Sequence, residues 1–168
     1  MTKRVDGVSV LQMLVIALIT VTPAFGQGGR GMMGDDAHAA DMQLFHQLFE
    51  HRTEINRQVT NRENGIETLT ESTNPEVTRL LQTHVAAMLA RVREGRPIHL
   101  RDPLFAELFK NADRIEARHE LTAGGVRVIE TSKDPYVVKL LQAHAQVVSA
   151  FMANGMSEMM KNHPVPPR

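Results

Sequence analysis

The 168-residue sequence contains no cysteine, no tryptophan and one tyrosine, and aromatic residues make up 4% of it. The absence of cysteine excludes disulfide bonds, cysteine-ligated zinc, iron–sulfur clusters, covalently attached c-type haem and a thiol nucleophile. A net charge is also lacking, because 19 basic residues balance 19 acidic ones. Binding to nucleic acid or to an anionic membrane depends on an excess of basic side chains, so the balanced charge argues against both partners.

Long hydrophobic runs are absent except at the start of the chain. A basic start at Lys3 and Arg4 precedes an apolar run over 8–21, and a small-x-small cleavage site follows at 24–26. The run is shorter than the ~20 residues that a membrane-spanning helix needs. Segment 1–26 is therefore predicted to be a secretory signal peptide. We expect a periplasmic or secreted protein with no membrane span after cleavage.

Glycine and proline gather near the two ends of the remaining chain. Segment 27–40 is rich in glycine and methionine, a composition that buries too little apolar surface to offset the entropy lost on ordering. We expect a flexible leader there. Segment 164–168 is rich in proline and is expected to form an extended tail. The folded part is predicted to lie between these two segments.

An internal repeat organises the folded part. Shifted by 60 residues, the chain aligns with itself without a gap and gives 13 identities over a 41-residue window. Duplication of one structural unit would leave such matches. We assign 41–95 to the first repeat, 96–102 to a linker and 103–163 to the second repeat. The matched positions of the first half are Leu44, Phe45, Leu48, Phe49, Ile55, Gly65, Ser72, Pro75, Val77, Leu80, Leu81, Gln82 and His84.

Each half is predicted to begin with a helix and to continue into a β-hairpin. Apolar residues recur at helical spacing in the first segment of each half, as over 44–55. The dipeptides Asn64-Gly65 and Gly124-Gly125 then lie between strand-like segments. Both dipeptides suit a tight turn with positive φ, and we therefore expect one hairpin in each half.

A second helix is predicted to follow each hairpin. Segments 74–75 and 134–135 each combine a capping residue with a proline at the first helical position. The apolar stripes that follow are expected to end near Gly95 and Gly155. The predicted fold is α+β, with two tandem helix–β-hairpin–helix repeats packed as one pseudo-twofold, helix-dominated domain. How the two hairpins pair stays open.

Only two of the eight histidines, His84 and His144, recur in both halves. They follow Leu80 and Leu140 by four residues, which places both on the apolar faces of their helices. Neutral imidazole is a common ligand of transition metals, so the pair suits a b-type haem, copper or zinc. Met88, one turn after His84, is an alternative soft ligand. The competing interpretation is a pair of core histidines that bond to backbone carbonyls or carboxylates.

Methionine suggests a second metal hypothesis. Soft thioether ligands bind Cu(I), which makes methionine and histidine at helical spacing near the C-terminus a candidate copper site. Methionine also fills gaps in cores and in partner grooves, and that role competes with copper binding. The residues concerned are Met152, Met156, Met159, Met160 and His163, together with Met32, Met33 and His38 near the N-terminus.

The other polar residues are expected to have structural roles. Ser72 and Ser132 precede helix caps, where hydroxyls bond to local backbone, and charged residues such as Arg57 and Arg91 are expected to cover solvated faces. No phosphate-binding loop, nucleophile elbow or repeated carboxylate pair is present. The predicted function is a small exported, non-catalytic metal- or haem-binding protein. The alternative is an accessory protein without a cofactor, whose methionine-rich end binds an exported partner.

Overall fold

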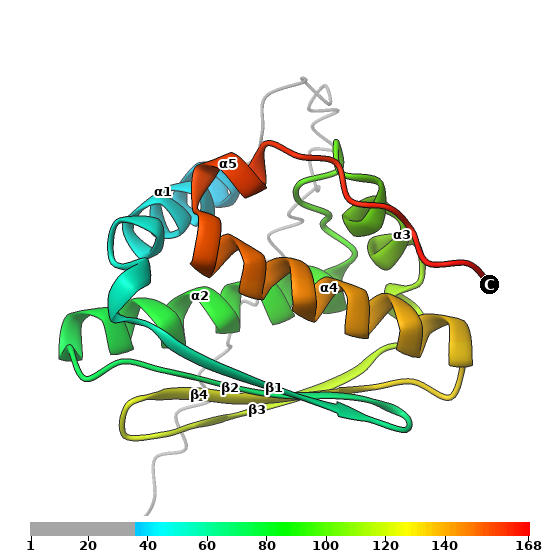
Figure 1. Ribbon diagram of the computed structural model, residues 1–168, viewed down its shortest axis with the longest axis horizontal. Helices are drawn as coiled ribbons and strands as arrows, with labels where there is room; N and C mark the ends of the chain where they lie inside the picture. The colour runs from blue at the N-terminus through cyan, green and yellow to red at the C-terminus, as the bar shows by residue number, and fades with distance from the viewer. Residues whose placement is uncertain (1–35) are drawn as a thin grey trace, which may run out of the picture. The chain divides into compact units, whose positions relative to one another are not determined.

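The computed structural model describes residues 36–168, in which five α-helices cover one face of a four-stranded antiparallel sheet (Figure 1). The prediction of a mixed helix and strand fold is confirmed. The predicted signal peptide and the first part of the predicted leader lie outside the described residues. In chain order the elements are α1 (Asp36–Glu50), η1 (Arg52–Glu54), β1 (Asn56–Arg62), β2 (Gly65–Glu71), α2 (Pro75–Glu94), α3 (Pro103–Lys110), η2 (Ala112–Arg114), β3 (Glu116–Leu121), β4 (Gly125–Thr131), α4 (Pro135–Asn154) and α5 (Met156–Met159).

The start of the first helix bears on the predicted organisation. Helix α1 begins at Asp36, inside the segment that was predicted to be leader.

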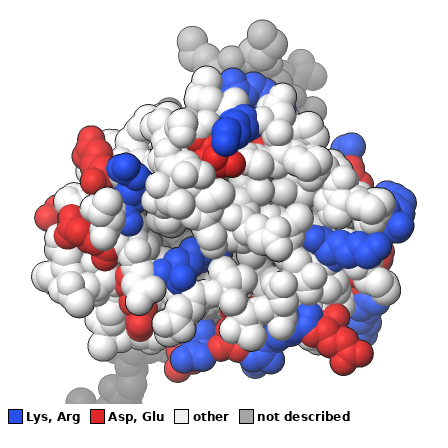
Figure 2. Space-filling view, in the orientation of Figure 1, with Lys and Arg blue, Asp and Glu red and all other residues white. Residues whose placement is uncertain are grey.

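None of the helices over 36–168 is long and apolar enough to cross a membrane. Charged side chains of both signs are scattered over the face seen in Figure 2, and neither sign forms a continuous patch there.

The second helix of each half begins and ends where the sequence predicts. The side chain of Asn74 accepts a hydrogen bond from the backbone N–H of Glu76, and Asp134 caps α4 in the same way. Such caps each stabilise a helix by about 1 kcal/mol. Helix α2 ends at Gly95, whose φ of 61° is left-handed, and α4 ends before Gly155.

Both predicted hairpins are present, but the left-handed turn residues expected in them are not. Asn64, Gly124 and Gly125 lack a positive φ, and the φ of 158° at Gly65 is close to extended backbone. The glycines instead allow the two hairpins to approach each other. A Cβ on Gly65 would lie 1.9 Å from the carbonyl oxygen of Glu130, and a Cβ on Gly125 would lie 2.1 Å from that of Thr70. Repetition of glycine therefore reflects the contact between hairpins rather than the turn within each one.

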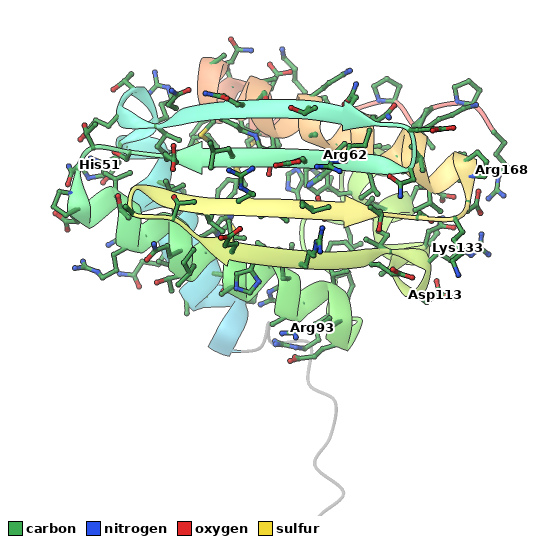
Figure 3. The ribbon with its side chains drawn as sticks, turned by 90° about the horizontal axis from the view of Figure 1, so that it is seen from below. His51, Arg62, Arg93, Asp113, Lys133 and Arg168 are labelled. Carbon is green, nitrogen blue, oxygen red and sulfur yellow. The ribbon has the colours of Figure 1, made fainter. Side chains whose placement is uncertain are left out.

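The two hairpins join edge to edge in the strand order β1-β2-β4-β3. The central strands β2 and β4 pair antiparallel along their whole length, and Thr68 lies opposite Val128 in the middle. Among residues 36–168 no helix covers the outer face of this sheet, which carries polar side chains (Figure 3). Glu67 on that face bonds to Arg62 and to Arg127, the latter at 2.5 Å.

Each long helix packs on the hairpin of the other half, α2 mainly on β4 and α4 mainly on β2. The repeated glutamines fix this arrangement. Gln82 donates to the carbonyl oxygens of Thr122 and Gly125 at 3.2 and 3.1 Å. Gln142 donates to the carbonyl oxygen of Arg62 at 3.2 Å. The two halves are therefore interlocked. Two of the core clusters combine residues of both halves, whereas a smaller one, formed by Leu48, Val77, Leu80 and Leu81, lies within the first half.

A buried ion pair joins α1 to α2. The Nε of Arg91, whose side chain is 2% exposed, donates to the carboxylate of Asp41. The expectation that Arg91 lies on a solvated face is wrong. Position 91 follows His84 by seven residues, and two turns of helix return a side chain to the same face. The pair fastens the first helix over the sheet.

Candidate functional site

A cavity of about 420 Å³ lies between the helices and the sheet. Small-molecule sites have volumes of about 300 to 1,000 Å³, with mostly apolar walls and a few placed polar groups. This cavity has that character, since phenylalanine, methionine and aliphatic side chains make up most of its wall. Its aromatic wall consists of Phe45, Phe49, Phe105, Phe109 and Phe151.

The two repeated histidines both border this cavity, His84 from α2 and His144 from α4, and Met88 borders it as well. Each imidazole packs against the phenylalanine at the matched position of its own half. The ring centroids are 5.5 Å apart for Phe45 and His84, and 5.0 Å apart for Phe105 and His144. The structure thus brings together the three residues that the sequence proposed as ligands.

Neither histidine has the hydrogen bonds of an ordinary core residue. The Nδ1 atoms of His84 and His144 are buried, and neither has a hydrogen-bond partner among residues 36–168. The interpretation as hydrogen-bonded core histidines requires such a partner. A buried ring nitrogen that lacks one is costly, and a ligand in the cavity would remove that cost for a nitrogen that faces it.

Both imidazoles are neutral at pH 7. Burial lowers the pKa of His84 to about 4, an effect that the Asp41 carboxylate opposes. Burial likewise lowers the pKa of His144 to about 4, and the positive charge of Arg57 lowers it further. The two residues are half-buried by surface area, because each borders the cavity. Protein atoms nevertheless surround both rings, so loss of hydration is the largest effect on each pKa. Neutral imidazole is the form that binds metal ions.

Arg57 is the residue that the sequence interpretation placed wrongly. It lines the cavity from β1 and donates from Nη1 to the hydroxyl of Thr70 at 2.8 Å. Side chains alternate along a strand, so Arg57 shares the inward face with Val59, which packs against the core. That alternation in the sequence could have shown that Arg57 faces inward. The Nε of Arg57 is buried and has no partner among the described residues.

A second buried ionisable group, Glu130, borders the same cavity from β4. Burial raises the pKa of its carboxyl, and the charge of Arg57 opposes that rise. Burial also lowers the pKa of the Arg57 guanidinium. Over residues 36–168 no ion pair joins Arg57 to Glu130, although both line the cavity and the charge of each acts on the pKa of the other.

Besides His38, the imidazole of His99 also borders the cavity, although it has no repeated counterpart to mark it in the sequence. Its backbone φ of 59° is positive, which is uncommon for a residue other than glycine. Its ring lies 4.9 Å from that of Phe105, and its Nε2 is buried without a hydrogen bond, 3.8 Å from the carboxylate of Asp102. Burial lowers the pKa of His99.

The methionine-rich copper site that the sequence suggested is not assembled within the described residues. Met156 and Met160 are 44% and 61% exposed, whereas Met152, Met159 and His38 line the cavity. His163 is occupied by two carboxylates, through Nδ1 with Asp102 at 2.6 Å and Nε2 with Glu158 at 3.2 Å. These side chains therefore face different surroundings. Met32 and Met33 lie outside the described residues.

A compact site of hard metal ligands is also missing from this part of the chain. Within the residues that the structure describes, no group of three or more histidine, aspartate or glutamate side chains is placed to hold a metal ion. No family model, curated protein or solved structure matches the chain. Arguments about function therefore rest on the geometry of the cavity.

Proposed function

We propose that this is an exported, non-catalytic binding protein that holds a b-type haem in the central cavity, with His84 and His144 as the iron ligands. The observation that carries the proposal is the placement of two neutral imidazoles, from two different helices, on the wall of one apolar cavity of about 420 Å³. Haem combines an apolar ring system with two axial iron positions. Met88 is the alternative to His84 as an axial ligand.

The size of the cavity favours haem over a bare metal ion. Metal–nitrogen bonds of about 2 Å enclose a volume far smaller than this cavity. Copper or zinc held by two imidazoles also needs further ligands, and the described residues offer no third histidine or carboxylate at metal distance. Haem brings four ligands of its own and requires only the axial pair.

We further propose that the two halves are copies of one helix–hairpin–helix unit, related by a pseudo-twofold axis through the centre of the sheet. The order helix, 3-10 turn, strand, strand, helix occurs twice in the described chain. Thr68 and Val128, which are matched by the 60-residue shift, lie directly opposite each other. The cross-half bonds of Gln82 and Gln142 follow the same relation. Such an axis would bring the two imidazoles to one cavity.

The test is spectroscopic. The exported protein is purified from a haem-replete host and also titrated with haemin in its colourless form. We expect one haem per chain and the Soret and visible bands of six-coordinate, low-spin iron. His84→Ala and His144→Ala should each weaken haem binding by roughly ten-fold or more and change the coordination state.

The matched control is His119→Ala. His119 lies on β3, is exposed and does not line the cavity, so its removal should leave the spectrum and affinity unchanged. His99 is unsuitable as a control, because it borders the cavity. A protein that stays colourless, contains no copper or zinc by elemental analysis and does not respond to haemin would refute the proposal.

A further inference from the structure

The polar groups of the cavity are divided between its two sides. The helices contribute the imidazoles of His38, His84 and His144 and the carboxylate of Asp41. The sheet contributes Arg57 from β1, Thr68 and Thr70 from β2, and Glu130 from β4. These four residues lie on the inward face of three neighbouring strands. A ligand that fills the cavity therefore meets one guanidinium, two hydroxyls and one carboxyl on the sheet side.

Arg57 has donors that the described residues do not satisfy. A guanidinium carries five N–H groups, and the protein bond shown for this one runs from Nη1 to the hydroxyl of Thr70. Its Nε is buried without a partner, and no carboxylate lies within ion-pair distance of it among residues 36–168. Glu130 is the carboxylate whose charge acts on this guanidinium, but no ion pair joins the two groups, and a buried N–H without a partner is costly. A carboxylate is the group that matches a guanidinium best, since it accepts two parallel hydrogen bonds.

The strand register explains why Glu130 does not fill this role. Arg57 lies opposite Thr70 on β2, whereas Glu130 lies opposite Ile66, four residues away along the same strand. At about 3.3 Å per residue the two backbone positions are offset by roughly 13 Å along the sheet. The two backbone positions are therefore too far offset for direct pairing across the strands, although the charges of the two side chains still act on each other.

The position of Arg57 also breaks the repeat. The residue matched to it in the second half is Ala117, and the residue matched to Glu130 is Thr70. The sheet side thus offers a single cation, at one end. A ligand with one charged end would enter in one orientation, although the imidazoles on the helix side are paired.

We propose that the ligand of this cavity carries a carboxylate and that Arg57 binds it. The inference rests on the proposed function and extends it, since it assigns a binding residue to the polar end of the bound molecule. A suitable ligand has a large apolar body and an acid group. Haem, with its propionates, and long-chain fatty acids both have this chemistry.

The experiment compares each ligand with its ester. Haemin and haemin dimethyl ester are titrated into the wild-type protein and into Arg57→Met, and palmitate is titrated in a separate series. We expect Arg57→Met to weaken binding of haemin roughly ten-fold or more and to leave binding of the dimethyl ester unchanged. The wild-type protein should prefer the free acid by the same factor, because the ester and the substitution remove the same interaction.

A general loss of structure cannot imitate this pattern, because it would weaken binding of the acid and the ester alike. Arg118→Met is the matched control, since Arg118 is exposed on β3 and does not line the cavity. If haemin binds but Arg57→Met and esterification have no effect, the carboxylate assignment is overturned and the proposed function stands. If palmitate binds in an Arg57-dependent manner and haemin does not bind, the assignment stands and the haem proposal fails. If neither ligand binds, both are overturned.

Discussion

Replacement of Gly65 by alanine tests how closely the two hairpins pack. The new Cβ would lie 1.9 Å from the carbonyl oxygen of Glu130, whereas such contacts do not fall below 3.0 Å, so β2 and β4 would have to separate by at least 1.1 Å. The opposing atom belongs to backbone and cannot rotate aside. Pairing between Gly65 and Thr131 would be lost at this end of the sheet. We expect the free energy of unfolding to fall by about 4 kcal/mol or more, a size reserved for strain and core disruption.

Gly95→Ala supplies the matched control. Gly95 has a φ of 61°, and nothing lies within 4 Å of its hypothetical Cβ, so alanine there meets only the left-handed backbone cost of about 1 to 2 kcal/mol. Unfolding in urea, followed by circular dichroism, gives both values. Gly125→Ala should resemble Gly65→Ala, because its Cβ would lie 2.1 Å from the carbonyl oxygen of Thr70. A loss for Gly65→Ala no larger than that for Gly95→Ala would refute the close-packing argument.

Three further predictions concern buried charge and pH. The pKa of His84 and of His144 falls from 6.5 to about 4 on folding, so as the pH falls the unfolded chain binds protons before the folded one does. The free energy of unfolding should therefore be highest above pH 6.5 and decrease toward pH 4, by up to about 3 kcal/mol for each ring. Phenylalanine at both positions should flatten this pH dependence, as measured by urea titrations at several pH values. Arg91→Met leaves the Asp41 carboxylate buried and alone, so we expect a loss of about 3 to 5 kcal/mol, against a negligible change for an exposed arginine of the same helix. His163 has the opposite pH dependence, because its two carboxylate partners outweigh burial and raise its pKa. Its contribution to the free energy of unfolding is therefore fully present below pH 6.5 and is lost as the pH rises through the raised pKa. Proteolysis of the C-terminal tail should accelerate over that rise in the wild-type protein and show no such pH dependence in His163→Gln.

The elements that the sequence predicted well are those with local signals. A capping side chain followed by proline marks the start of α2 and of α4, and a glycine marks the end of each. These signals lie within a few residues of the feature that they specify. The hairpins were likewise predicted from turn-forming residues between strand-like segments, and both are confirmed.

The errors arise where distant segments meet. Gly65 and Gly125 were interpreted as turn residues because glycine near a turn is ordinarily explained locally, yet their neighbours in space are the carbonyl groups of Glu130 and Thr70. The packing of α2 on the second hairpin depends on the same long-range pairing. A single sequence shows which residues repeat, but it does not show which surface each repeated residue contacts.

The internal repeat identified the cavity residues that occur in both halves, but it gave no indication of those that occur in one half only. His84 and His144 were found because each half supplies one copy. Arg57 and His99 were missed as cavity residues because the repeat comparison gives no weight to positions without a matched partner. The alternation along β1 would have placed Arg57 inward beside Val59, had each strand been interpreted alone.

The residues that differ between the two halves, Arg57 and Glu130, bear on the orientation of the bound ligand. Under the proposed pseudo-twofold relation, two equivalent imidazoles would accept a symmetric ligand in either orientation. Arg57 and Glu130 on the sheet side remove that equivalence, because their matched positions hold Ala117 and Thr70 and a carboxylate gains a partner near Arg57. Under the proposed duplication, the repeat accounts for the pair of ligands, and divergence at positions 57 and 130 accounts for a single orientation of the bound molecule. An Arg57→Ala, Glu130→Thr double variant restores the matched pairs at both positions. It should bind haemin in two orientations, visible by NMR as a doubled set of haem methyl resonances, whereas one set in this variant would contradict the argument.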